Sequence, residues 1–271
     1  MLTTILCTAL AAGLALQPGA DNKNRPHVTL KLISEETHLR PGATQTLGLV
    51  FTMEPHWHVY YKGLEGGGNP PKIEEAKLPE GYSFGEIEWP APQRYIAPGD
   101  VYDSVYEGQV TLLVPLHVPQ DAKPGEKVTI GVKMNWLECS EVCVFGAGES
   151  SIALPVSREA SQRSDDAKLI DASRARMPVP LPTDGSIAAK VAGGALTVQA
   201  PNATRLEFYP GSECTDLDEP AKHTRADGPT LKVPFAGPDK IRARAFGVLG
   251  VWSGTDKKPA YFRIDTSAKG G

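Results

Sequence analysis

The sequence predicts an all-β protein with two immunoglobulin-like β-sandwich domains, joined by a short helix and a proline-rich linker. Its 271 residues are enough for two domains of ordinary size. The 27 glycines and 24 prolines indicate many turns, as in sandwich folds. Short segments with alternating apolar and polar residues also outnumber segments with helical periodicity. About seven such segments precede residue 157, which is the number that an immunoglobulin-like sandwich needs.

Residues 1–20 predict a signal peptide. Residues 2–16 are apolar but too few to span a bilayer comfortably, and small residues at 19 and 20 precede a polar segment. We therefore expect a periplasmic or secreted protein, with an uncleaved N-terminal anchor as the alternative. Export to an oxidising compartment permits disulfides. Cleavage would remove Cys7 and leave Cys139, Cys143 and Cys214. The formal net charge of −4 gives no reason to expect a nucleic-acid partner.

Residues 25–157 predict the first sandwich domain. Within it, residues 93–100 predict an irregular loop that exposes two apolar side chains, Tyr95 and Ile96. Exposed apolar residues on a loop are more often functional than the same residues in a core. The predicted strands of this domain are residues 27–33, 45–53, 82–89, 109–118, 127–137 and 150–156.

Residues 54–62 are rich in aromatic side chains and predict a further strand. Alternation places Trp57 on one side of this strand, and His56, His58 and Tyr60 on the other. The two histidines would suit a metal ion, but we favour the simpler interpretation, in which they are surface imidazoles beside a packed tryptophan.

Residues 158–182 predict the connection between the domains. A helix is expected over residues 164–176, with Ser164 as its N-cap and Arg174 in its last turn, where charge complements the helix dipole. Three prolines then make residues 177–182 a stiff, extended linker.

Residues 183–268 predict a second, smaller sandwich. Its candidate chemistry is limited to His223 and to Cys214, which lies in a polar segment and is expected to be an idle thiol. The predicted strands are residues 195–200, 205–209, 230–235, 240–246, 247–252 and 260–265.

Cys139 and Cys143 carry the strongest chemical signal in the chain. They follow a predicted strand, and a disulfide between them would close a ring of about five residues, which stabilises a fold by only about 2 kcal/mol. A ring this small is also expected to be strained and therefore easy to reduce. We favour a redox-active pair over three alternatives: a local clip, two buried thiols, or a soft-metal site for Cu(I) with Met53, Met134 or a histidine.

The residues next to the cysteine pair predict thiols that react slowly. Glu138 and Glu141 flank Cys139, and no basic residue lies between Lys133 and Arg158. Nearby carboxylates and apolar burial both disfavour a thiolate. We therefore expect the pair to react when a docked partner supplies the attacking thiolate.

No other arrangement in the sequence supports catalysis. It contains no Ser/His/Asp set, no paired carboxylates and no cofactor fingerprint, so we predict no cofactor and no metal. If the protein is an enzyme, thiol:disulfide interchange is the activity that its residues allow.

Several segments together resemble the N-terminal periplasmic domain of DsbD-type thiol:disulfide interchange proteins, with most similarity to the ScsB-like branch. The resemblance covers residues 25–157 and is carried by segments in the family's order: Trp57-His58-Val59-Tyr60, Asn69-Pro70-Pro71-Lys72-Ile73, Leu78-Pro79-Glu80-Gly81, Ile87-Glu88-Trp89-Pro90-Ala91-Pro92, Tyr106-Glu107-Gly108 and Trp136-Leu137-Glu138-Cys139 with Cys143.

The resemblance implies an immunoglobulin-like fold in which Cys139 and Cys143 exchange electrons with a periplasmic thioredoxin-like or disulfide isomerase-like partner. It also implies that a cap loop shields the pair until the partner docks. Residues 93–100 match that loop, so Tyr95 is the candidate cap residue, with Ile96 beside it. Family members place aromatic residues near the pair from the segment that matches Trp57, His58 and Tyr60.

Full-length members of this family also have a membrane-embedded domain and a C-terminal thioredoxin-like domain, which the present sequence lacks. We therefore expect a separate membrane protein to act as electron donor. Two other functions stay open on sequence alone: a periplasmic copper-binding protein that uses the same cysteines, and a structural or adhesive sandwich in which the pair is a clip.

Overall fold

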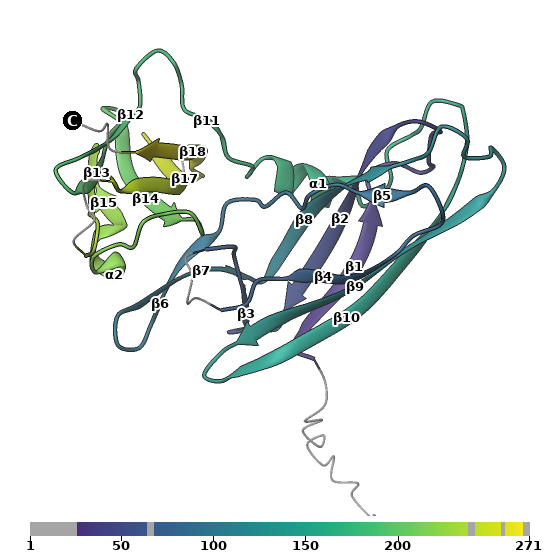
Figure 1. Ribbon diagram of the computed structural model, residues 1–271, viewed down its shortest axis with the longest axis horizontal. Coiled ribbons are helices and arrows are strands. Elements are labelled where there is room, and N and C mark those ends of the chain that lie inside the picture. Colours follow the sequence, from purple (N-terminus) through teal and green to yellow (C-terminus); the bar gives the residue numbers. More distant parts are fainter. Residues whose placement is uncertain (1–25, 64–67, 238–241, 256–257, 268–271) are drawn as a thin grey trace, which may run out of the picture.

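The computed structural model describes residues 26–63, 68–237, 242–255 and 258–267, and these residues form two domains that lie side by side (Figure 1). The predicted signal peptide and Cys7 fall outside the described residues. The fold is all-β, as predicted, and the described part contains two short helices, α1 (Ala167–Arg174) and α2 (Pro220–His223). None of the described helices is both long and apolar enough to cross a membrane.

Two facing sheets make up the first domain. One has the order β1-β2-β8-β5, and the other has the order β10-β9-β3-β7-β6, with β4 also paired to β9. The first sheet consists of β1 (Val28–Ser34), β2 (Thr44–Met53), β8 (Gln109–His117) and β5 (Ser83–Phe84). The second consists of β10 (Cys143–Pro155), β9 (Lys127–Cys139), β3 (His58–Tyr60), β7 (Val101–Glu107), β6 (Gln93–Ala97) and β4 (Lys72–Lys77).

The main core fills the space between these sheets. Trp136 from β9 is 1% exposed, and its ring lies edge-on to Phe51 of β2, with 5.2 Å between the ring centroids. The strand predicted over residues 82–89 is shorter than expected. Only β5 forms there, followed by a hydrogen bond from the Gly85 N–H to the Pro115 carbonyl and by a single bridge between Glu88 and Leu113.

Helix α1 covers the outer face of the first sheet. Ile170 is fully buried there against Ile33, Val50 and Leu113. The helix begins later than predicted, because Asp166 rather than Ser164 is its N-cap, and the Ser164 hydroxyl instead donates to the carbonyl of Ser34.

Arg174 lies in the last turn of α1, as predicted, but it is tied to the first sheet. Its guanidinium binds the Glu35 carboxylate, with Nη2 2.8 Å from Oε2, and this hydrogen bond lowers the pKa of Glu35. The helix is thus fixed to the sandwich by a charged contact as well as by apolar packing.

The linker is part of a sheet. Within it, β11 (Val179–Pro180) pairs in parallel with β18 (Ala260–Ser267), so it is an edge strand and not a free spacer. We therefore propose that the second domain includes residues 179–180, ahead of the predicted start at residue 183.

The second domain also has two sheets, in the orders β11-β18-β17-β14-β15 and β12-β13-β16. Residues 240–252 were predicted to form two strands, but residues 244–253 form one strand. The glycine at 247 is needed for close strand approach, since a Cβ there would lie 2.2 Å from the carbonyl oxygen of Tyr209. The remaining strands are β12 (Ala188–Ala192), β13 (Ala195–Gln199), β14 (Ala203–Pro210), β15 (Arg225–Asp227), β16 (Thr230–Pro234) and β17 (Arg244–Ser253).

The two domains share apolar packing. Tyr209 and Val248 of the second domain are buried in the main core cluster of the first. The hairpin of β6 and β7 lies against the second domain, where Tyr102 Oη donates to the carbonyl of Phe208 over 3.3 Å and Arg94 donates to the carbonyl of Ala221. The second domain therefore holds this hairpin at Arg94, near its open end, and at Tyr102, which pairs with Ile96 near its turn.

Gly146 provides a test of how tightly the core of the first domain packs around Trp136. It lies directly opposite Trp136 on the β9–β10 pair, and a Cβ added there would be 2.2 Å from Trp136 Nε1. We expect Gly146→Ala to lower the free energy of unfolding by about 1–3 kcal/mol, because the buried ring has no room to move. Denaturant titration checks this. The matched control is Ala147→Ser, at the next and exposed position; equal stability of the two variants would contradict the packing argument.

Candidate functional site

Cys139 and Cys143 are joined by a disulfide at the end of the β9–β10 hairpin. The two residues face each other directly across the hairpin, with 4.1 Å between their Cα atoms and 1.98 Å between their sulfur atoms. Residues 140–142 form the loop that connects them, closed by a hydrogen bond from the Ser140 N–H to the Val142 carbonyl. The pair thus lies at one tip of the first domain.

The disulfide faces away from the main core. Along β9, Trp136 belongs to the main core, whereas Cys139 belongs to a small separate cluster with Tyr60 and Val105. Within this cluster Cys139 is 2% exposed, while Cys143 is exposed. One sulfur is therefore protected by protein and the other is accessible to a reaction partner.

Tyr60 hydrogen-bonds the protected sulfur. Its hydroxyl donates to Cys139 Sγ over 3.2 Å and lies 3.9 Å from Cys143 Sγ. Burial raises the pKa of Tyr60 to about 12, so the hydroxyl keeps its proton and remains a donor at neutral pH. A donor in this position stabilises negative charge on Cys139 Sγ when the disulfide opens.

His58 lies beside the disulfide and is buried. It pairs with Cys139 on β9 and with Glu107 on β7, and it is 2% exposed. Its ring centroid is 5.3 Å from that of Tyr60 and 4.6 Å from that of Tyr95. The expectation of a surface imidazole is therefore wrong for His58, because the ring of Tyr95 from β6 packs over it. His56 is exposed, as expected.

Neither ring nitrogen of His58 has a hydrogen-bond partner among the described residues. Buried polar side chains in folded proteins nearly always have one. Burial lowers the pKa of His58, so the imidazole is neutral at neutral pH. An uncharged, unpartnered imidazole thus lies opposite the buried sulfur of the pair.

Tyr95 lies on a β-hairpin and not on the irregular loop that the sequence predicted. Strands β6 and β7 pair from Gln93–Val105 to Ala97–Val101, and the turn between them contains Gly99 with φ +88°. A regular hairpin forms because the glycine permits this tight turn. Tyr95 is half-buried and packs on the cluster around Cys139.

Two other predicted site residues lie outside this cluster. Ile96 follows Tyr95 on β6, so alternation turns it to the opposite face of the hairpin. Trp57 stacks on His27, with 3.7 Å between the ring centroids and 5° between the ring planes, and packs against the main core. The structure therefore brings His58, Tyr60 and Tyr95 together around the pair.

The carboxylates next to the pair have separate environments. Glu138 is 2% exposed and points toward the core, where it accepts hydrogen bonds from Trp136 Nε1 over 2.8 Å and from the His27 N–H over 3.2 Å. Glu141 is exposed in the loop. The sequence did not single out Asp103, which pairs with Tyr95 across the hairpin and whose pKa is raised by burial. It escaped notice because its segment carries no distinctive motif.

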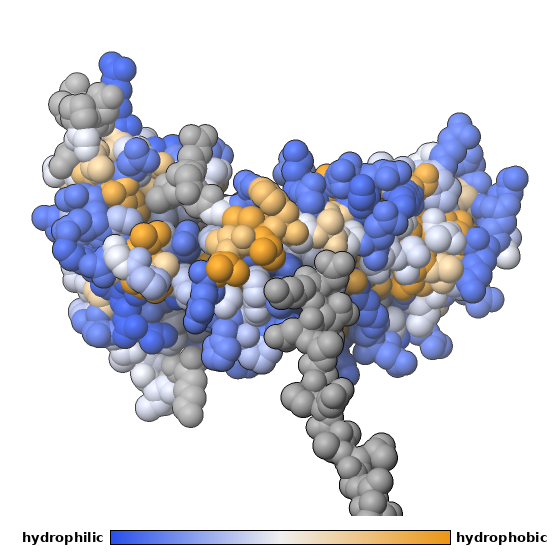
Figure 2. Space-filling view, turned by 90° about the horizontal axis from the view of Figure 1, so that it is seen from below, coloured by the Kyte–Doolittle hydropathy of each residue, from blue (hydrophilic) through white to orange (hydrophobic). Residues whose placement is uncertain are grey.

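Three apolar side chains next to Cys143 in the chain form an exposed apolar rim at this tip of the hairpin. It consists of Val142, Val144 and Phe145, whose exposed fractions are 63%, 40% and 83%. Figure 2 shows an apolar patch on the face of the molecule where the end of the β9–β10 hairpin lies. Exposed apolar side chains grouped in this way are typical of protein-binding surfaces. The sequence feature that could have predicted this surface is the two apolar residues, Val144 and Phe145, directly after Cys143.

The remaining thiol and the predicted soft-metal donors lie elsewhere. Cys214 is 8% exposed rather than in an open polar loop, and burial raises its pKa to about 11, which makes it unreactive. Met53 and Met134 are buried in the main core, on the side of the sheet away from the disulfide. Among the described residues, no group of three or more His, Cys, Asp or Glu side chains could hold a metal ion.

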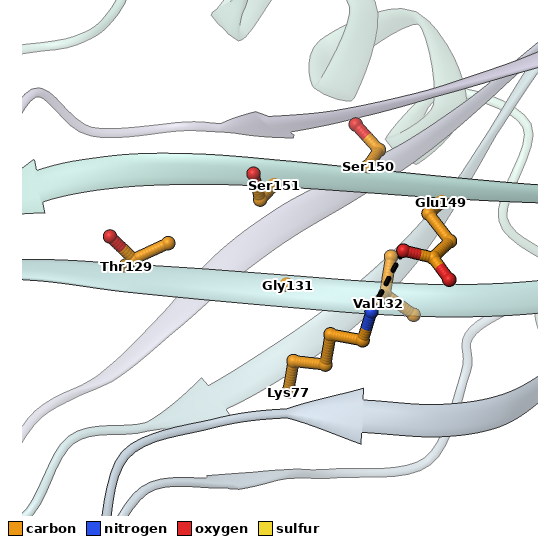
Figure 3. A pocket seen from close by; sticks show the side chains of 7 residues that line it. All are labelled: Lys77, Thr129, Gly131, Val132, Glu149, Ser150 and Ser151. Carbon is orange, nitrogen blue, oxygen red and sulfur yellow. Dashed lines mark hydrogen bonds and ion pairs between the residues drawn. The ribbon is translucent and has the colours of Figure 1, made fainter.

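A polar hollow on the outer side of β4, β9 and β10 offers no comparable chemistry (Figure 3). Lys77 Nζ and Glu149 Oε2 lie 2.7 Å apart and neutralise each other. Ser150 is turned away from this ion pair, and its hydroxyl accepts the Leu32 N–H of β1 over 2.8 Å.

Comparisons with known proteins give a family match for part of the chain and a likeness in fold. Residues 30–155 match the family described as thiol:disulfide interchange protein DsbD, N-terminal. The crystal structure of the N-terminal periplasmic domain of ScsB from Proteus mirabilis has a TM-score of 0.55 at 16% identity, covering 93% of this chain and 97% of that one. This likeness shows the fold. A protein of unknown function from Porphyromonas gingivalis W83 has a TM-score of 0.28 at 10% identity, covering 89% of this chain and 100% of that one. No curated protein matches the sequence.

His58 makes the stability of the fold depend on pH. Because burial lowers its pKa from 6.5, the unfolded state binds a proton more readily than the folded state just below pH 6.5. The free energy of unfolding therefore falls as the pH decreases below 6.5, by up to about 1.4 kcal/mol per pH unit from one group, until the folded-state pKa is reached. We expect His58→Phe to remove this contribution in denaturant titrations between pH 5 and 8.

The control for this experiment is His56→Asn, which changes an exposed imidazole. Its pH dependence should follow the unmodified protein. Parallel curves for His58→Phe and the unmodified protein would mean that the buried imidazole does not govern this part of the pH dependence.

Proposed function

We propose that this protein is a periplasmic dithiol–disulfide exchange module, which passes electrons to or from a thioredoxin-like partner through Cys139 and Cys143. The match of residues 30–155 to the DsbD N-terminal family supports this proposal. The observation that carries this proposal is the asymmetry of the disulfide. Cys143 is exposed next to the apolar rim, whereas Cys139 is covered and hydrogen-bonded by Tyr60.

In the reducing direction, a partner thiolate attacks Cys143 Sγ and breaks the bond to Cys139. A mixed disulfide forms between the partner and Cys143, and Cys139 leaves as a thiolate that then takes up a proton. The partner's second thiol attacks the mixed disulfide and releases Cys143. Two electrons and two protons move in total: the partner's two thiols become a disulfide, and this domain gains two thiols. In the opposite direction, Cys143 attacks the partner and Cys139 resolves the mixed disulfide.

The surroundings of Cys139 support its role as the leaving and resolving sulfur. The hydroxyl of Tyr60 donates to it and stabilises the thiolate as it departs. No cation adds to this effect, since His58 is held neutral by burial. A single neutral donor gives modest stabilisation, which supports slow reaction with small thiols and a need for a docked partner.

The hairpin of β6 and β7 fits the role of a cover. Tyr95 packs on the cluster that contains Cys139, and the second domain anchors the hairpin at Arg94 and Tyr102. We infer that the backbone of the hairpin stays fixed while the ring of Tyr95 yields to a docking partner. Val142, Val144 and Phe145 would then contact the apolar surface around the partner's own thiols.

Single cysteine variants test the assignment of the two sulfurs. Cys139→Ala leaves the exposed thiol without its resolving partner, so we expect it to accumulate a mixed disulfide with a thioredoxin-like protein. Cys143→Ala leaves the covered Cys139 as the one thiol of the pair, beside the buried Cys214, and should accumulate little mixed disulfide. Non-reducing electrophoresis and mass spectrometry measure both.

Cys214→Ala is the matched control, and it should exchange like the unmodified protein. Exchange at an undiminished rate by the Cys139→Ser/Cys143→Ser double variant would refute the proposal. Loss of stability alone, with no change in exchange, would favour the structural clip.

Tyr95→Ala tests the cover. Removing the ring uncovers Cys139 Sγ, which is otherwise protected, so a small thiol can attack either sulfur and we expect dithiothreitol to reduce the disulfide at least about twofold faster. The control is Ile96→Ala, which truncates the neighbouring side chain on the opposite face of the same hairpin. Stopped-flow measurement of thiol release compares the two. If both variants react at the rate of the unmodified protein, Tyr95 does not limit access.

A further inference from the structure

His58 lies on the same face of its sheet as the disulfide. In the pairing of β3 with β9 it is directly opposite Cys139, and directly opposed residues of antiparallel strands project their side chains to one face. Tyr60, two residues further along β3, has the same orientation, because its hydroxyl reaches Cys139 Sγ. The imidazole is therefore the cross-strand neighbour of the covered sulfur.

This imidazole is buried without a partner in the oxidised protein. Both ring nitrogens lack a hydrogen bond within the part of the chain that the structure describes, and the residue is 2% exposed. A buried polar group of this kind requires a specific explanation, such as a role in redox chemistry. A closed disulfide carries no hydrogen, whereas reduction gives Cys139 an S–H group that can donate to an imidazole nitrogen.

The other titratable groups that face His58 are less suited to accept this hydrogen. Tyr60 keeps its own proton, since burial raises its pKa to about 12. Tyr95 packs its ring over the imidazole, with 4.6 Å between the ring centroids. Glu107, which is exposed, and the half-buried Asp103 both lie on β7, one strand further from the sulfur than β3. Asp103 is directly opposite Tyr95 and is the competing base.

From these contacts, we propose that His58 is the base that accepts the thiol proton of Cys139 when the two cysteines close into a disulfide. In this step Cys139 Sγ attacks Cys143 Sγ of the mixed disulfide and forms a bond to it. The bond from Cys143 to the partner breaks, and the partner's sulfur leaves with the electron pair. The proton moves to a ring nitrogen of His58, which later releases it to solvent. The partner is reduced and the pair is oxidised.

A neutral imidazole suits this role. Burial lowers the pKa of His58, so the ring is uncharged at neutral pH and keeps a free lone pair. Burial also disfavours a thiolate, so Cys139 by itself supplies little of the attacking form. Proton transfer from Cys139 to His58 creates a thiolate beside an imidazolium without exchange of a proton with water. Between pH 6.5 and 8 the rate of closure is then nearly independent of pH.

Closure is measured on the reduced full chain with dithiobis(nitrobenzoate), in a Cys214→Ala background that removes the buried third thiol. Cys143 attacks the reagent and releases one coloured thiolate, and Cys139 then attacks Cys143 and releases a second. The rate of the second release does not depend on reagent concentration and reports closure. We expect this rate to change by less than about threefold between pH 6.5 and 8.

Two variants remove the base. His58→Phe should close at least about tenfold more slowly at pH 7, and its rate should rise about tenfold per pH unit, because the thiolate must form by loss of a proton to water. His58→Gln can accept a hydrogen bond but not a proton, so it should show the same steep pH dependence. It separates proton transfer from hydrogen bonding, and it keeps the test decisive if His58→Phe does not fold.

Asp103→Asn removes the competing carboxylate and should keep the flat pH profile, as should His56→Asn at an exposed position. A flat profile in both His58 variants, a steep profile in the Cys214→Ala background, or loss of the flat profile in Asp103→Asn would overturn the proposal.

This inference rests on the proposed function in one respect, because it takes Cys139 as the resolving sulfur. The assay contains no protein partner, so the two proposals fail separately. The expected profiles together with no exchange with a thioredoxin-like protein would support His58 as the base and refute the proposed partner.

Discussion

The antiparallel pairing of β9 with β10 fixes where the chemistry of this protein lies. Because Cys139 and Cys143 are opposed in register, both sulfurs project to the same face of the hairpin. The same alternation sends Trp136 to the other face, into the main core. A shift of one residue would bury the disulfide in the sandwich and expose the tryptophan. The large core contact of Trp136 therefore also holds the reactive pair at the surface.

The surroundings of the pair provide one hydrogen-bond donor, and the imidazole beside it is uncharged. Tyr60 is the hydrogen-bond donor to Cys139, His58 is held neutral, and Glu138 is turned toward the core. Such an environment neither traps a thiolate nor strongly repels one. The equilibrium between the dithiol and the disulfide can therefore be shifted by a partner that docks at the apolar rim. This is the behaviour expected of an exchange module.

The second domain contributes to the site indirectly. Tyr209 and Val248 complete the core of the first domain, and contacts to Arg94 and Tyr102 hold the hairpin that carries Tyr95. The linker joins the same sheet as β11. The two domains are thus one packed unit.

The sequence alone determined the all-β class, most strands and the importance of Cys139 and Cys143, because these follow from local alternation and from the spacing of two residues. It also placed His58 and Tyr60 on one side of a strand and Trp57 on the other. Only the tertiary structure decided what covers that side. The ring of Tyr95 arrives from a strand far along the chain and buries His58, and nothing local to either residue encodes the contact.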